Sequence, residues 1–234
     1  MSFWQATMRR SVKLSRTYFI MGLLMSVVGI TISNVYSLIP ADLLNIEGTS
    51  IDLINNMPLA SVSLLALSAL MFSMPVMMLF VFDKNTGVFE YLLSTGLSQF
   101  DVYKGYVKAS LSLAIILLVF SNLLNTAMWI YIGNSLGFLA TIAVLTFTVG
   151  LSGVLLGTVS MMAFSSFQKT QLGANQPLGI AIGMVPVLPA LMVPFIFPSY
   201  ALFIIISIAA LTLLISLALL LLSGRLIPRE KLLP

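Results

Sequence analysis

The sequence contains no cysteine and no histidine among its 234 residues. Without cysteine the chain cannot form a disulfide, ligate an iron–sulfur cluster or use a thiol nucleophile. Without histidine it lacks the usual protein ligand of haem, the commonest ligand of catalytic zinc and the base of a serine–histidine dyad. We therefore expect no catalytic residue, no metal site and no cofactor on this chain.

Charged residues are scarce: they make up 8% of the chain, whereas 59% is hydrophobic and the mean hydropathy is +1.10. Soluble domains carry about 25% charged residues, so the composition indicates an integral membrane protein. The sequence also lacks the G-x-x-x-x-G-K-[ST] motif that cradles nucleotide phosphates. We therefore expect that the chain is not an enzyme, and that an ATPase, if one is involved, is a separate polypeptide.

Long uncharged stretches predict six membrane-spanning helices. The stretches are 17–39, 58–82, 109–168 and 170–224. As one helix the third stretch would be about 90 Å long, three times the hydrocarbon thickness of about 30 Å. It must therefore fold back, and Gly133-Asn-Ser-Leu-Gly137 is the expected turn. The fourth stretch is also too long for one span, so it must fold back as well. Its break is expected between Pro194 and Tyr200. None of these stretches contains the charged residues that ion-coupled transporters usually carry.

The positions of the basic residues predict the topology. All Lys and Arg residues fall in four places, which bracket the three apolar hairpins: 9–16, 84–108, Lys169 and 225–231. The positive-inside rule puts all four places in the cytoplasm, and it leaves the acids Asp42, Glu47 and Asp52 outside. We therefore expect a multi-pass cell-membrane protein with both termini cytoplasmic and no nucleic-acid partner. No polar segment is large enough to fold alone, so residues 1–234 are expected to form a single transmembrane domain.

Residues 1–16 predict an amphipathic helix that lies in the plane of the lipid headgroups. On a helical wheel one side carries Phe3, Trp4, Met8, Val12 and Leu14, and the other carries Arg9, Arg10, Lys13 and Arg16. Tryptophan suits the membrane boundary, and the cations suit anionic lipid. A cleavable signal peptide is the alternative. The apolar run that follows is far longer than the roughly 7–15 residues of a signal core, however, and no A-x-A site follows it.

The charged segment 83–108 is too polar to cross a bilayer and predicts a short amphipathic helix in water. Asn85 and Thr86 are N-cap types, and Glu90 falls in the first turn, where a carboxylate suits the positive helix end. Its apolar face is expected to comprise Val88, Tyr91, Leu92 and Thr95. Such a segment between two apolar hairpins offers a firm surface to an aqueous partner.

Two further signals predict how this helix ends and how the next one begins. Gly96 suits the left-handed position just after a helix C-terminus. Ser98 and Asp101 then have the spacing of a capping box, which predicts a second helix that starts at this point.

The run FDKNTGVFEYLLSTGLSQFDVYKG resembles the cytoplasmic loop of type-2 ABC transporter permeases. That family often shows a charged pair, then G-x-x-E-x-L-L-x-T-P, and after a spacer a G-K or K-G pair. The matching positions are Asp83, Lys84, Gly87, Glu90, Leu92, Leu93, Thr95, Lys104 and Gly105. One departure is Gly96, where the family usually has proline; either residue ends a helix.

The resemblance implies that the chain is the permease subunit of an ATP-driven ABC exporter. It would pair with a second permease chain, identical or related, and with cytoplasmic ABC ATPase subunits that hold ATP and Mg²⁺. Residues 2–15 would be the interfacial elbow helix, and residues 86–95 would be the coupling helix that contacts the ATPase. The implied contact residues are Thr86, Gly87, Phe89, Glu90, Leu92, Leu93 and Gly96. The alternatives are a non-transporting membrane scaffold or assembly subunit, and a permease of the haem-exporter type.

Mild polar residues within the spans have two interpretations. Ser26 and Ser33 in the first span, and Asn122 and Asn125 in the third, could border a translocation path. Hydrogen bonding between helices is the favoured interpretation.

Small residues in the later spans predict close helix packing. Gly150-Leu-Ser-Gly153 imitates the nucleophile motif of intramembrane serine proteases, but the chain has no histidine to act as the base. Together with Gly157, these glycines form a small-residue stripe, and Gly179 and Gly183 form another. Such stripes let helix backbones approach closely in lipid.

Overall fold

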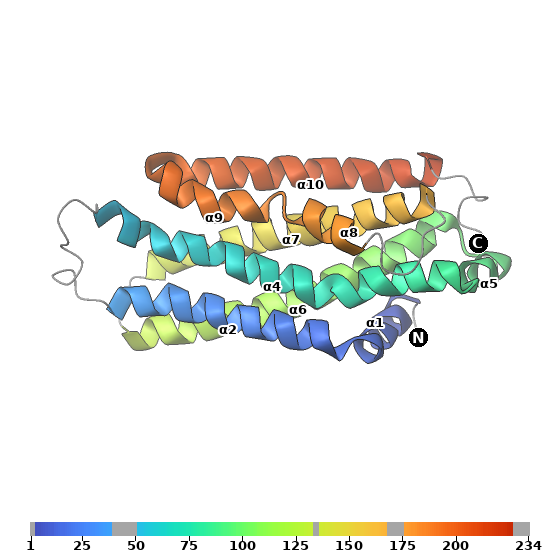
Figure 1. Ribbon diagram of the computed structural model, residues 1–234, viewed down its shortest axis with the longest axis horizontal. Coiled ribbons are helices and arrows are strands. Elements are labelled where there is room, and N and C mark those ends of the chain that lie inside the picture. Colours follow the sequence, from blue (N-terminus) through green and yellow to red (C-terminus); the bar gives the residue numbers. More distant parts are fainter. Residues whose placement is uncertain (1–2, 39–50, 133–135, 168–175, 227–234) are drawn as a thin grey trace.

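The computed structural model describes residues 3–38, 51–132, 136–167 and 176–226, and these residues are helical apart from short connections (Figure 1). The predicted all-α class is confirmed for them. The long helices are α2 (Arg16–Leu38), α4 (Ile51–Asn85), α6 (Gln99–Ile132), α7 (Leu136–Phe167) and α10 (Ala201–Leu226). The short ones are α1 (Phe3–Leu14), α5 (Val88–Ser94), α8 (Gln176–Gly183), α9 (Val187–Ile196) and the 3₁₀ turn η1 (Pro198–Tyr200).

The five long helices are long and apolar enough to cross a membrane, which indicates a multi-pass membrane protein. They run side by side along an elongated bundle (Figure 1). The two predicted fold-backs fall at the expected places: α6 ends at Ile132 and α7 begins at Leu136, and η1 separates α9 from α10. Hydropathy and turn residues alone therefore locate the long helices.

The stretch expected to form the fifth span is divided into α8 and α9, so the prediction of six long helices is met by only five among the described residues. Residues 184–186 form a turn between the two. Pro186 has no backbone N–H to donate to the preceding turn. The carbonyl of Met184 instead accepts from the N–H groups of Val187 at 2.9 Å and Leu188 at 2.8 Å, where α9 begins.

Helix α4 is the centre of the bundle. It packs against α2, α6, α7 and α9, and 72% of its apolar stretch is buried, against 22% of that of α10. Its buried serines each donate to a carbonyl of their own helix: Ser61, Ser63, Ser68 and Ser73. These hydroxyls are thus satisfied without water, as a membrane interior requires.

Glycine brings α7 and α8 into backbone contact, which confirms the predicted small-residue packing. A Cβ added at Gly157 would lie 2.9 Å from the carbonyl oxygen of Gly179, and one added at Gly153 would lie 2.8 Å from that of Gly183. Real Cβ atoms essentially never come so close, so only glycine permits this approach.

Several predicted positions lie outside the described residues. They are the acids Asp42 and Glu47 of the first loop, Lys169, and the basic residues of the tail after Leu226.

Candidate functional site

The site with the most distinctive geometry is α5, the short helix between α4 and α6, at the same end of the bundle as α1 (Figure 1). The chain enters it through Gly87, whose φ of +75° is the left-handed conformation. The predicted caps Asn85 and Thr86 are wrong. Helix α4 continues to Asn85, and the Thr86 hydroxyl donates back to the carbonyl of Phe82 at 2.9 Å, so it is not available to α5.

Helix α5 is held in place by Phe89, which is 1% exposed. Its ring centroid lies 5.0 Å from that of Phe80 on α4 and 6.0 Å from that of Tyr106 on α6. Phe80 also contacts the rings of Tyr103 and Tyr106. These four rings are called the aromatic cluster below. They join α5 directly to both neighbouring long helices.

The outward face of α5 differs from the predicted apolar face. Tyr91, expected on that face, is 69% exposed, and Thr95 and Glu90 are exposed as well. Leu92 is half-buried and packs against the core. Phe89, implied by the resemblance as a contact residue for the ATPase, is instead buried inside the protein. Its own segment does not reveal this, because the partners that bury it lie on other helices. The exposed surface of α5 is therefore formed by Glu90, Tyr91 and Ser94.

The end of α5 and the start of α6 follow the prediction. Gly96 adopts φ +88°, and its N–H donates to the carbonyl of Leu93 at 3.2 Å. The Ser98 hydroxyl accepts from the N–H of Asp101 at 3.1 Å and donates to the Asp101 carboxylate at 2.6 Å. These local contacts fix the connection between α5 and α6.

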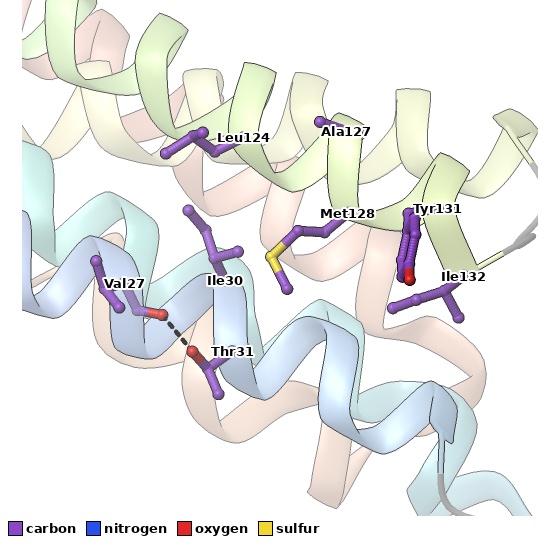
Figure 2. Close-up of a pocket in the computed structure, with 8 residues that line it drawn as sticks. All are labelled: Val27, Ile30, Thr31, Leu124, Ala127, Met128, Tyr131 and Ile132. Carbon is purple, nitrogen blue, oxygen red and sulfur yellow. Dashed lines mark hydrogen bonds between the residues drawn. The ribbon is translucent and has the colours of Figure 1, made fainter.

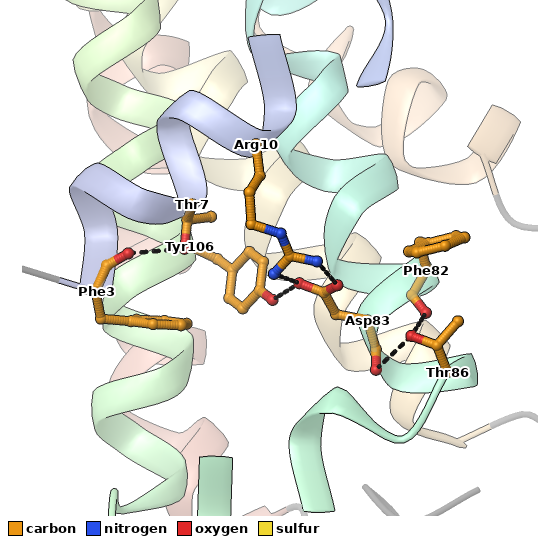
Figure 3. A network of polar contacts seen from close by, with 7 residues as sticks. All are labelled: Phe3, Thr7, Arg10, Phe82, Asp83, Thr86 and Tyr106. Atoms are coloured by element: carbon orange, nitrogen blue, oxygen red, sulfur yellow. Dashed lines mark hydrogen bonds and ion pairs between the residues drawn. The ribbon is translucent and has the colours of Figure 1, made fainter. Parts of the chain in front are cut away.

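A charge network lies where α1, α4 and α6 meet, near the end of α4 that leads into α5 (Figure 3). The Asp83 carboxylate is fully buried and accepts two hydrogen bonds from the Arg10 guanidinium, at 2.6 and 3.0 Å. It also accepts one from the Tyr106 hydroxyl. Paired, bidentate hydrogen bonds of this kind compensate the burial of a carboxylate. The network joins α1, α4 and α6 at one point.

The predicted amphipathic helix exists as α1, but it packs on α4 and α6 with an unexpected face. Thr7 and Ser11 are buried, whereas Val12 and Leu14 are exposed. Phe3 packs edge-on against Tyr106, with ring centroids 5.6 Å apart. Of the basic residues predicted to face lipid, Arg10 pairs with Asp83 although its side chain is 44% exposed, and Arg9 and Lys13 are exposed.

The polar residues of the spans meet between α2 and α6. The contacts are Ser26 with Ser121, Asn34 with Asn125 at 2.9 Å, and Trp129 with Ser33 at 3.3 Å. These six residues are called the α2–α6 seam. Asn122 instead donates to the carbonyl of Leu118 in its own helix. The favoured interpretation, hydrogen bonding between helices, is observed for Ser26, Ser33 and Asn125. A translocation path along these residues stays a prediction.

Beside the seam, an apolar groove of about 390 Å³ opens between α2 and α6 (Figure 2). Its lining is apolar apart from Thr31 and Tyr131. The Thr31 hydroxyl donates to the carbonyl of Val27 in its own helix at 2.8 Å. The groove therefore presents little that would orient a polar substrate.

No family model matches the chain, and no curated protein and no solved structure matches it either.

Proposed function

We propose that the chain is the permease subunit of an ATP-driven exporter of the type-2 ABC class. The observation that carries the proposal is α5, a short helix anchored by Phe89 that leaves Glu90 and Tyr91 exposed. The segment 83–105, which contains α5, is also the one that resembles the cytoplasmic loop of that family. An anchored helix passes on a displacement, whereas a flexible linker would absorb it.

In this proposal a separate ATPase holds ATP and Mg²⁺ and moves α5 when it closes. Phe89 would transmit that movement to α4 through Phe80 and to α6 through Tyr106, with which its ring is in contact. The Arg10–Asp83 pair would carry α1 along with them. The energy would thus enter at one end of the bundle and reach the long helices through side chains that are packed together.

The proposed topology has six crossings with both termini in the cytoplasm. Helices α8 and α9 would together make the fifth crossing, because they follow one another along the bundle between α7 and α10 (Figure 1). Helix α1 and the last turn of α10 lie at the same end of the bundle (Figure 1), which supports an even number of crossings. The basic residues of α1 and of the segment that contains α5 favour the cytoplasm for this end.

The class also implies a second permease chain. Exposed apolar side chains on α2 and α10, among them Leu24, Phe203 and Leu214, suit either lipid or such a chain.

The test is affinity purification of the tagged chain from its native membranes. We expect a P-loop ATPase to co-purify. Substituting Tyr91→Ala should weaken its binding about 30-fold, as expected for an aromatic residue at the centre of an interface. The control is Tyr131→Ala, which removes an exposed tyrosine (93%, against 69% for Tyr91) from the far end of α6. Co-purification of partners without any ATPase would contradict the proposal and favour the scaffold alternative.

A further inference from the structure

Helix α6 extends beyond the hydrocarbon layer at its N-terminal end. With 34 residues it is about 51 Å long, whereas the hydrocarbon core is about 30 Å thick. Its charged residues all lie in the first three turns: Asp101, Lys104 and Lys108. From Ala109 onward the helix is uncharged. Lys104 and Lys108 therefore lie at the level of the lipid headgroups.

A hollow of about 200 Å³ lies at this level, between α1 and α6. Phe3 and Trp4 of α1 line one side, and Lys104 and Lys108, one helical turn apart, line the other. Gly105 is part of the lining because it lacks a side chain, and this lets the Phe3 ring rest against α6. The hollow thus combines an interfacial tryptophan, an aromatic wall and two exposed cations.

An exposed apolar stripe leads from this hollow toward the middle of the membrane. Ile115 lies seven residues after Lys108 and Val119 lies eleven residues after it, so all three share one face of α6. Both apolar side chains are exposed, at 42% and 43%. A lipid whose acyl chain lies along this stripe would place its headgroup at Lys108.

We propose that the hollow binds the headgroup of an anionic glycerophospholipid. The phosphodiester interacts with Lys104 and Lys108, and Trp4 packs at the level of the glycerol. Asp101 also lines the hollow, and its carboxylate accepts a hydrogen bond from the Ser98 hydroxyl. The hollow therefore carries one net positive charge, which suits a singly charged phosphodiester. Basic pockets at the cytoplasmic ends of membrane helices commonly bind such headgroups. The proposal is independent of the exporter function.

The test uses the full-length chain with Trp129→Phe, so that Trp4 is its only tryptophan, in phosphatidylcholine vesicles. Phosphatidylglycerol with brominated acyl chains, which quenches nearby tryptophan, is compared with brominated phosphatidylcholine at equal mole fraction. We expect phosphatidylglycerol to be preferred at Trp4 by about fivefold, the effect of one net charge near the surface. Equal quenching by the two lipids would overturn the proposal. If Trp129→Phe impairs folding, native mass spectrometry of the unsubstituted chain measures the same preference from the lipids retained.

Three variants and one competing anion test whether the preference for phosphatidylglycerol arises in the hollow. Replacing Lys104 and Lys108 together with Gln should abolish the preference, whereas Asp101→Asn should raise it. Replacing Arg225 and Arg229 with Gln removes the same charge from another part of the sequence and should leave the preference unchanged. An equal loss in that control would show a general charge effect and overturn the site. Displacement of phosphatidylglycerol by millimolar inorganic phosphate would assign the hollow to a soluble anion and overturn the lipid proposal.

Discussion

The charge network beside α5 and the α2–α6 seam both join helices through polar side chains, but they differ in chemistry. At the α5 end a full negative charge on Asp83 is held by the positive charge of Arg10. The seam contains only hydroxyl, amide and indole groups. The Arg10 side chain is 44% exposed, so the charge pair reaches the surface of the protein.

This difference follows from the cost of burying charge. An ion in hydrocarbon is expensive, so charge pairs are expected near water and neutral hydrogen bonds in the middle of the membrane. The charge network also ties α1, α4 and α6 together next to the point where α5 is attached. The seam joins only α2 and α6, and through weaker contacts.

The largest expected effect comes from removing Arg10. Arg10→Met leaves the buried Asp83 carboxylate without its counter-charge, at a cost of about 3 kcal/mol. Unfolding by SDS in mixed micelles, followed by circular dichroism, measures this loss. The control is Arg9→Met, which removes the same charge from an exposed neighbour. If both variants unfolded at the same SDS fraction, the network would have no special role.

A smaller effect is expected from Tyr106→Phe, which removes one hydroxyl and keeps the ring in the aromatic cluster. The Asp83 carboxylate loses one of its three hydrogen bonds, worth about 2 kcal/mol for a charged acceptor. The same SDS titration applies, with Tyr91→Phe on the exposed face of α5 as the control. A loss as small as that of the control would contradict the assigned hydrogen bond.

The smallest effect is expected in the seam. Asn125→Leu breaks the interhelical bond with Asn34 and should cost about 0.6 kcal/mol, and at most about 1.7. Asn122→Leu is the matched control, because its amide bonds only within its own helix among the hydrogen bonds described. A loss from Asn125→Leu as large as that from Arg10→Met would invalidate the comparison between the two regions.

Local signals in the sequence predicted local structure well. Gly96 ends α5 and Ser98 caps α6 because each acts through residues within three positions of itself. Arg10 and Asp83 are 73 positions apart, so no periodic pattern in the sequence indicates that they pair. The burial of Phe89 likewise depends on helices that a wheel of its own segment does not contain. The division of α8 from α9 has a local signal in Pro186, which lacks the backbone N–H that a continuous helix needs.

The central claim is that α5 faces the cytoplasm and meets an ATPase, and single-cysteine labelling tests it most directly. Because the chain has no cysteine, Tyr91→Cys and Tyr131→Cys each introduce the only thiol. A membrane-impermeant maleimide added to intact cells should label position 131 and leave position 91 unlabelled. A cross-linker with a maleimide at one end and an amine-reactive succinimidyl ester at the other, added after permeabilisation, should join position 91, and not position 131, to a lysine of a P-loop ATPase. Labelling of both positions from outside, or cross-linking of neither, would contradict the account.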